Sequence, residues 1–127
     1  MREVVWGDEF GPMGEDPYSL GIQANGFVFC SGQTGSDPKT GELISADIVG
    51  QTKQTLHNIS AVLQAAGTSL EKIVKTTVFL TDISDFAEMN EAYQSFFQQN
   101  PPARSTVQVA ALPTPGARIE IEAIAVK

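Results

Sequence analysis

IVKTTVFL, residues 73–80, is the stretch that decides which fold we expect for this chain. It is rich in β-branched residues and apolar at both odd and even positions, which is typical of a strand buried on its two faces. A strand of this kind belongs in the middle of a sheet. Helical patterns precede and follow it, so the expected architecture is a sheet with helices packed against it.

Two helices are expected, one on each side of this strand along the chain. Between Asp47 and Ala66 the apolar positions recur at steps of three and four residues, and Gly67 then ends the helix. After the strand, Asp82–Asp85 offers capping residues for a second helix that continues through Gln98. The sequence Asn100-Pro101-Pro102 stops that second helix.

The remaining segments predict strands toward both ends of the chain. The dipeptide Asn25-Gly26 accepts the positive φ angles of a tight turn and predicts a hairpin. Two alternating segments around Leu112–Gly116 predict a second hairpin. The expected strands are Glu3–Trp6, Tyr18–Ala24, Phe27–Ser31, Arg104–Ala111 and Ala117–Val126, with loops at Gly7–Pro17 and Gly32–Gly41.

The order of these elements predicts an α+β fold in which two helices cover one face of a sheet. The 127 residues are close to the commonest domain size, so we expect a single domain that spans residues 1–127.

Alternation in the last two predicted strands separates polar from apolar residues. Arg104 and Thr106 share one face of the first strand, and Glu120 and Glu122 share one face of the second. If both apolar faces meet the helices, Arg104 and the two glutamates lie together on the far face of the sheet. A guanidinium can hold a carboxylate through two hydrogen bonds, and a carboxylate can orient or deprotonate a water molecule. Such a set is suited to binding and hydrolysing a small carboxylic acid.

By alternation alone, the stronger interpretation is that these charges form the solvated face of a two-layer sheet. One observation argues against it. Residues 73–80 are apolar on both faces, so the far face of the sheet needs a cover. A second copy of the same sheet is the economical cover, because most soluble assemblies are symmetric homo-oligomers. Polar residues at such a contact would line clefts between subunits.

The composition argues against several classes of function. Fifteen acidic and 8 basic residues give a net charge of −7, so no nucleic-acid partner is expected. One cysteine, Cys30, cannot form an internal disulfide, and one histidine, His57, leaves too few ligands for a structural zinc site. Residues Met1–Gly14 lack the apolar run of a signal peptide, and no segment approaches the roughly 20 apolar residues of a membrane span. We therefore expect a cytoplasmic protein.

Three single side chains are assigned by their surroundings. His57 falls on the polar side of the first helix and is expected in solvent, whereas Cys30 is expected in the core. Lys75, inside an apolar strand, must extend its amine to water or meet a partner, and it either borders the cleft or pairs with a glutamate.

Several motifs of this chain form a recognisable set. The most specific is Pro102-Ala103-Arg104-Ser105-Thr106-Val107, followed by Leu112-Pro113 and by GARIEIEAIA at residues 116–125. Further motifs of the set are Ser31-Gly32-Gln33, Asp37–Gly41, Gln54–Ile59, Ala65–Gly67 and Val74–Val78. Together they closely resemble the motifs of the Rid (YjgF-like) family, and the resemblance spans Pro17–Lys127, which is nearly the whole chain.

The resemblance implies a chorismate-mutase-like fold, with a mixed sheet and two helices on one face. It also implies a homotrimer with a central barrel and three active sites between subunits. In such a site Arg104 pairs with the substrate carboxylate and Glu120 acts on the catalytic water, without metal or any other cofactor. The implied substrate-binding positions are Tyr18, Ser31, Gly32, Asn90 and Thr106.

Two positions depart from the family pattern. Asp16 stands where many members have glycine before Pro17-Tyr18, and Thr106 stands where some have cysteine. The threonine argues against a thiol nucleophile at that position, whereas a route through water needs none.

The implied activity is hydrolytic deamination of reactive enamines and imines, namely 2-aminoacrylate, 2-iminopropanoate and 2-iminobutanoate, to 2-oxo acids and ammonia. The alternative is a non-catalytic protein that binds or senses a small 2-oxo acid or other carboxylate in the same cleft. A third hypothesis, a ribonuclease or translation inhibitor as some relatives have been described, conflicts with the acidic charge balance.

Overall fold

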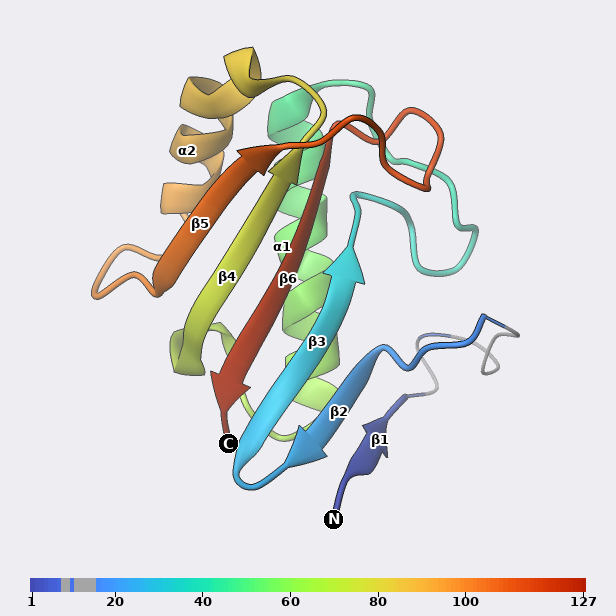
Figure 1. Cartoon of the computed structure of the whole chain (residues 1–127), viewed down its shortest axis with the longest axis vertical. Helices are drawn as coiled ribbons and strands as arrows, with labels where there is room; N and C mark the ends of the chain where they lie inside the picture. Colours follow the sequence, from blue (N-terminus) through green and yellow to red (C-terminus); the bar gives the residue numbers. More distant parts are fainter. Residues whose placement is uncertain (8–9, 11–15) are drawn as a thin grey trace.

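A mixed sheet carries both long helices on the same face in the computed structural model, which describes residues 1–7, 10 and 16–127 (Figure 1). The helices are α1 (Ile48–Ala65) and α2 (Phe86–Gln94), with short 3₁₀ turns η2 (Leu70–Lys72) and η3 (Ile83–Asp85). The strands are β1 (Glu3–Val5), β2 (Gly21–Ala24), β3 (Phe27–Gln33), β4 (Ile73–Leu80), β5 (Ala103–Gln108) and β6 (Ile119–Val126). The predicted α+β class with two helices on one face of the sheet is confirmed.

The first hairpin forms where the sequence predicts it. Asn25 and Gly26 adopt φ angles of 51° and 80°, and the turn pairs Ala24 of β2 with Phe27 of β3. Positive φ at both central positions matches the right-handed twist of the flanking strands. β2 begins at Gly21 rather than Tyr18. The predicted loop Gly7–Pro17 lies partly outside the described residues.

α1 has the predicted boundaries because its capping residues are local signals. Asp47 is the N-cap, and its carboxylate accepts a hydrogen bond from the Gly50 amide at 2.9 Å. Gly67, with φ of 84°, ends the helix, and the Thr68 amide donates back to the Leu63 carbonyl at 2.9 Å. This is a Schellman motif, which satisfies carbonyls that the last turn leaves open.

α2 is shorter than predicted, because it ends at Gln94 and not at Gln98. The next residues form tighter turns, with the Phe97 amide donating to the Gln94 carbonyl at 3.1 Å. Phe97 nevertheless stays in the core, and its ring lies 4.7 Å from that of Tyr93. The regular spacing of apolar residues that predicted the helix therefore continues past the end of α2.

The second predicted hairpin is wrong. The sheet order is β1-β2-β3-β6-β4-β5, so β4 lies between β5 and β6. β4 pairs in parallel with β5, and the chain crosses between them through α2, as a parallel pair requires. The two last strands are close in sequence, but β6 pairs antiparallel with β3 and β4 instead.

The predicted face of β5 is also wrong. Arg104 pairs with Thr76 and Thr106 pairs with Val78, and both β4 residues are fully buried beneath the helices. Paired residues point to the same side of a sheet, so Arg104 and Thr106 lie on the helix face. Val107, which was expected in the core, lies on the other face and is 42% exposed. The prediction that Arg104 shares a face with Glu120 and Glu122 therefore fails.

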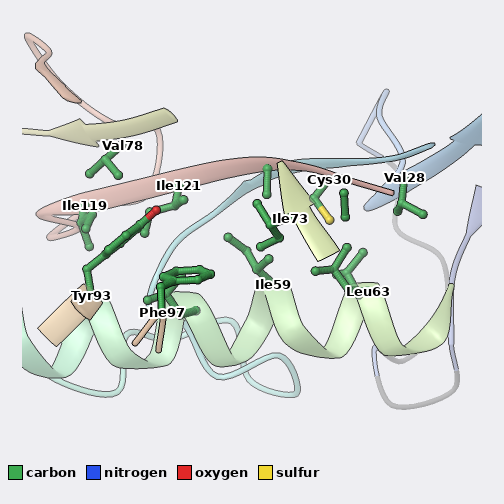
Figure 2. Close-up of a cluster of buried hydrophobic side chains, with 14 of the residues drawn as sticks. Val28, Cys30, Ile59, Leu63, Ile73, Val78, Tyr93, Phe97, Ile119 and Ile121 are labelled. Carbon is green, nitrogen blue, oxygen red and sulfur yellow. The ribbon is translucent and has the colours of Figure 1, made fainter. Parts of the chain in front are cut away.

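The core lies between the helices and the sheet, where Ile59 and Leu63 of α1 point toward Cys30 and Ile73 (Figure 2). The opposite face carries no helix within the described residues, and Phe27 and Phe29 are 38% and 42% exposed there. Among the described helices, none has the length and apolar character needed to cross a membrane.

An ion pair joins the start of α2 to the start of β6. Arg118 Nη2 lies 2.8 Å from Asp85 Oδ1, and the Asp85 side chain is only 7% exposed. The second carboxylate oxygen of Asp85 is buried without a hydrogen-bond partner. The carboxylate therefore depends on Arg118 for its neutralisation.

We expect Arg118→Ala to lower the free energy of unfolding by about 3 kcal/mol, because it leaves the buried Asp85 carboxylate without a counter-charge. Urea denaturation at fixed protein concentration measures the change. Lys53→Ala, at an exposed position of α1, is the control and is expected to stay within about 0.5 kcal/mol of the parent. An Arg118→Ala protein as stable as the control would contradict this role.

Candidate active site

Two clefts contain the residues that the sequence singled out. The Glu120 cleft, of about 770 Å³, lies at the far face of the sheet and its adjoining loops. The Arg104 cleft, of about 520 Å³, lies at the α2 side of β5. The Glu120 cleft is lined by Tyr18, Ser31, Gly32, Asn58, Glu120 and Glu122 among others, and the Arg104 cleft by Asn90, Tyr93, Phe97, Pro102 and Arg104 among others.

A break in strand pairing shapes the Glu120 cleft. Cys30 pairs with Ala123 but Gln33 pairs with Ile121, so β3 has one more residue than β6 across this interval. This is a β-bulge at Ser31-Gly32, a feature that re-aims side chains and is frequent beside active sites. Ser31 is held there, because its Oγ donates to the Ser19 carbonyl at 2.6 Å.

Glycine at position 32 makes room for the catalytic candidate. A β-carbon built on Gly32 would come within 2.8 Å of Glu120 Cδ, so any side chain there would displace the carboxylate. Burial raises the pKa of Glu120, and the neighbouring Glu122 carboxylate raises it further. A carboxyl whose pKa is shifted toward neutrality is suited to exchanging protons with water.

We expect Glu122→Gln to lower the pKa of Glu120, because the substitution removes a negative charge that opposes its ionisation. The pKa stays above its ordinary value, since burial remains. The carboxyl ¹³C signal of Glu120, followed against pH by NMR, gives the midpoint. Glu88→Gln, at an exposed position of α2, should leave that midpoint unchanged. An equal shift in both variants would refute the proposed effect of Glu122 on Glu120.

Asn58 anchors the loop that forms one wall of the Glu120 cleft. This side chain is 7% exposed, and its Nδ2 donates to the carbonyls of Thr34 and Ser36 at 3.0 and 2.8 Å. A β-carbon on Gly35 would come within 2.8 Å of the α1 backbone at Gln51. The loop therefore packs directly on α1, which fixes its distance from Glu120.

Gln51 anchors a second site loop from the same helix. It is fully buried; its Nε2 donates to the Gly116 carbonyl at 3.2 Å and its Oε1 accepts from the Arg118 amide at 2.7 Å. Neither Gln51 nor Asn58 was predicted from the sequence as an anchor. Their signal was available, because Gln51 and Asn58 are polar residues seven positions apart on the buried stripe of α1.

Arg104 occupies an unusual environment in the second cleft. Its guanidinium carbon lies 4.8 Å from the ring centre of Tyr93 and 5.6 Å from that of Phe86. Within the described part of the chain it forms no ion pair with a carboxylate. Its donors therefore remain available for a ligand.

The predicted site residues divide into two groups by sheet face. Glu120 pairs with Phe79 and Glu122 with Thr77, which places both glutamates on the face away from the helices. Arg104 lies on the helix face of β5, two strands from β6. Tyr18, Ser31 and Gly32 border the cleft of Glu120, whereas Asn90 borders that of Arg104 and Thr106 follows Arg104 on the same face of β5. Within one chain, Arg104 and Glu120 cannot contact the same small molecule.

The other singled-out side chains lie outside both clefts. His57 is exposed, with its ring 5.1 Å from that of Phe96, and Cys30 is buried as expected. Lys75 lines a hollow of about 200 Å³ with Thr77 and Glu122, and its amine donates to Ser105 Oγ at 3.4 Å. The described residues contain no cluster of three or more metal-ligating side chains.

Burial raises the pKa of the Cys30 thiol to about 12, so we expect this thiol to react slowly with thiol reagents in the native protein. A rise from 9.0 to about 12 reduces the thiolate fraction at pH 8 about a thousandfold. Reaction with a chromogenic disulfide at pH 8 should be slow in buffer and fast in urea. Equal rates in both would show that the thiol is accessible in the folded state.

Comparison with known proteins identifies relatives across the whole chain. The family model described as Endoribonuclease L-PSP matches residues 11–127. A RutC family protein of Pyrococcus horikoshii is 50% identical over 127 residues, covering 100% of this chain and 99% of that protein. The 2-iminobutanoate/2-iminopropanoate deaminase of Mus musculus is 47% identical over 116 residues, which cover 91% of this chain and 85% of that protein.

Solved structures agree with the fold. A Rid family protein of unknown function from Yersinia pestis superposes with a TM-score of 0.92 at 45% identity, over 100% of both chains. E. coli TdcF with bound serine gives a TM-score of 0.89 at 42% identity, over 98% of both chains.

A mixed sheet with two helices on one face and a charged cleft on either side defines a small α+β protein with sites for polar ligands. The sequence and structural matches narrow this class, and the chain belongs to the Rid family.

Proposed function

We propose that this protein is a cofactor-independent deaminase that hydrolyses 2-aminoacrylate, 2-iminopropanoate and 2-iminobutanoate to 2-oxo acids and ammonia. In this proposal it acts as a homotrimer, and each active site joins the Arg104 cleft of one protomer to the Glu120 cleft of the next. The observation that carries the proposal is the separation of Arg104 and Glu120 onto opposite faces of one sheet. The two groups can serve one substrate only when two chains supply them.

The relatives support this chemistry. The mouse protein, 47% identical, is named a 2-iminobutanoate/2-iminopropanoate deaminase, and the bound serine of E. coli TdcF is a small molecule with a carboxylate. The net charge of −7 favours a small substrate over the RNA that the family model's description suggests.

The exposed apolar residues on the far face support the trimer. Phe27, Phe29 and Val107 are 38%, 42% and 42% exposed in the single chain, although they are strand residues of the types found in cores. Three such sheets facing one another would close a central barrel and cover these side chains, since a cyclic assembly uses the same contact at each junction. We place the protein in the cytoplasm, where its single thiol stays reduced.

Substrate binding in the proposed site begins with the acid group. The Arg104 guanidinium holds the substrate carboxylate through paired N–H donors, which fixes the position of the adjacent C2 carbon. Asn90 and Thr106 lie beside Arg104, while Tyr18, Ser31 and Gly32 approach from the other protomer. An enamine such as 2-aminoacrylate becomes the imine when its C3 carbon takes up a proton and its nitrogen gives one up.

Glu120 then promotes the addition of water. Its carboxylate accepts a proton from water as the oxygen attacks C2 and returns that proton to the imine nitrogen, giving a carbinolamine in which C2 carries both a hydroxyl and an amine. Glu120 then moves the hydroxyl proton to the amine nitrogen while the C2–N bond breaks and C2=O forms, and ammonia leaves with the 2-oxo acid. The raised pKa of Glu120 suits both halves of this exchange. One imine and one water thus give one 2-oxo acid and one ammonia.

The test is a mixing experiment with two inactive variants. A serine or threonine dehydratase supplies the substrate, and ammonia release is followed with and without this protein. Arg104→Ala and Glu120→Gln are each expected to lower kcat/KM by about a hundredfold or more. Refolded together in equal amounts, they should recover about a quarter of the wild-type activity, because that share of junctions pairs two intact halves.

The control mixes the two variants after each has been refolded separately. No acceleration by the wild-type protein would refute the deaminase proposal and leave the non-catalytic carboxylate-binding alternative, which calorimetry with 2-oxobutanoate would reveal. An active wild type without recovery in the mixed trimers would refute the shared site alone.

A further inference from the structure

We propose that Phe86 and Tyr93 form an aromatic clamp that positions the Arg104 guanidinium for a planar carboxylate. In this role they are positioning residues, and Thr76 holds the clamp from beneath. The inference rests on the proposed function, because it assigns these residues to the substrate-binding half of the same site.

The geometry of the clamp comes from α2 and β5. Phe86 and Tyr93 lie seven residues apart on α2, hence on the same side of the helix, and both rings are directed at Arg104. The guanidinium carbon lies 4.8 Å from the Tyr93 ring centre and 5.6 Å from that of Phe86. Both distances are within the range of a cation–π contact.

Tyr93 is itself fixed by a buried hydrogen bond. Its hydroxyl lies 2.7 Å from Thr76 Oγ1, and Thr76 is the β4 residue that pairs with Arg104 in the parallel ladder. Thr76 is fully buried and Tyr93 is 5% exposed, so neither group can exchange this bond for water. β4 therefore positions both the backbone of Arg104, through strand pairing, and the ring of Tyr93, through Thr76.

The clamp leaves the charge of Arg104 uncompensated. In the part of the chain that the structure describes, the ion pairs comprise only that of Arg118 with Asp85. A carboxylate partner would occupy the guanidinium donors, whereas an aromatic ring contacts its flat face and leaves the N–H groups at its edge available. Burial raises the pKa of the Tyr93 phenol, partly offset by Thr76 and Arg104, so the ring stays neutral.

An Arg104 guanidinium held flat against the two rings should prefer a planar anion that binds at its N–H edge. A carboxylate lies in the plane of the guanidinium and receives two parallel N–H donors. Asn90 and Pro102 line the same cleft. The cleft therefore has space beside the guanidinium N–H groups for the short side chain of a substrate. Loss of one ring frees the guanidinium to rotate, so ligand affinity should fall without loss of the charge itself.

The experiment compares Phe86→Leu with Phe96→Leu in the assembled protein. Phe86 is 38% exposed, so its replacement leaves the core intact. Phe96 lies two residues beyond the end of α2 and its ring contacts His57 rather than Arg104, which makes it a control for the loss of an aromatic ring. Calorimetry measures the affinity for 2-oxobutanoate, and NMR follows the Nε–Hε signal of Arg104 without ligand.

We expect Phe86→Leu to weaken 2-oxobutanoate binding about two- to fivefold and to move the Arg104 Nε–Hε signal, because a ring current is lost. Phe96→Leu should change neither. Tyr93→Phe keeps the ring but removes its bond to Thr76, and it should also weaken binding.

The outcomes separate the clamp from the deaminase proposal. Unchanged binding and an unchanged Arg104 signal in Phe86→Leu would overturn the clamp while leaving the deaminase intact. Binding by the wild type with the expected loss in Phe86→Leu, but no imine hydrolysis, would support the clamp and overturn the deaminase. A wild type that does not bind 2-oxobutanoate would overturn the clamp's role in binding.

Discussion

The pairing of β4 with both β5 and β6 is the constraint on which the arrangement of the site depends. β4 lies between these strands, in parallel with β5 and antiparallel to β6. Thr76 and Val78 are buried and pair with Arg104 and Thr106, which therefore lie on the helix face. Thr77 and Phe79 pair with Glu122 and Glu120, which lie on the opposite face. A shift of either ladder by one residue would exchange the faces and dismantle both clefts.

Local structure was predictable because the signals that specify it are local. Asn25-Gly26 determines its turn through backbone conformation, and Asp47 and Gly67 bound α1 through hydrogen bonds within a few residues. The predicted boundaries of β4, residues 73–80, are confirmed for a similar reason. Turn formers and caps flank these segments, so distant parts of the chain had little influence on where each one ends.

The order of the strands was not predictable, because it depends on contacts between distant segments. The segments that became β5 and β6 alternate and are separated by a short span, which is also the pattern of a hairpin. β5 is an edge strand whose more polar face, with Arg104 and Thr106, lies toward the helices, so its alternation indicated the wrong core side. The candidate residues came from motif resemblance, but their division between two clefts became visible only from the register of β4.

This division has a chemical consequence for the proposed site. If Arg104 and Glu120 were neighbours in one chain, they would pair, which would occupy the guanidinium donors and lower the pKa of the glutamate. On opposite faces each keeps the property that its role needs: Arg104 rests on aromatic rings with its donors available, and Glu120 has a raised pKa through burial and the nearby Glu122. In the proposed trimer the substrate carboxylate enters with its own negative charge and neutralises Arg104. The carboxyl group of Glu120 can therefore approach the imine carbon without losing its affinity for a proton.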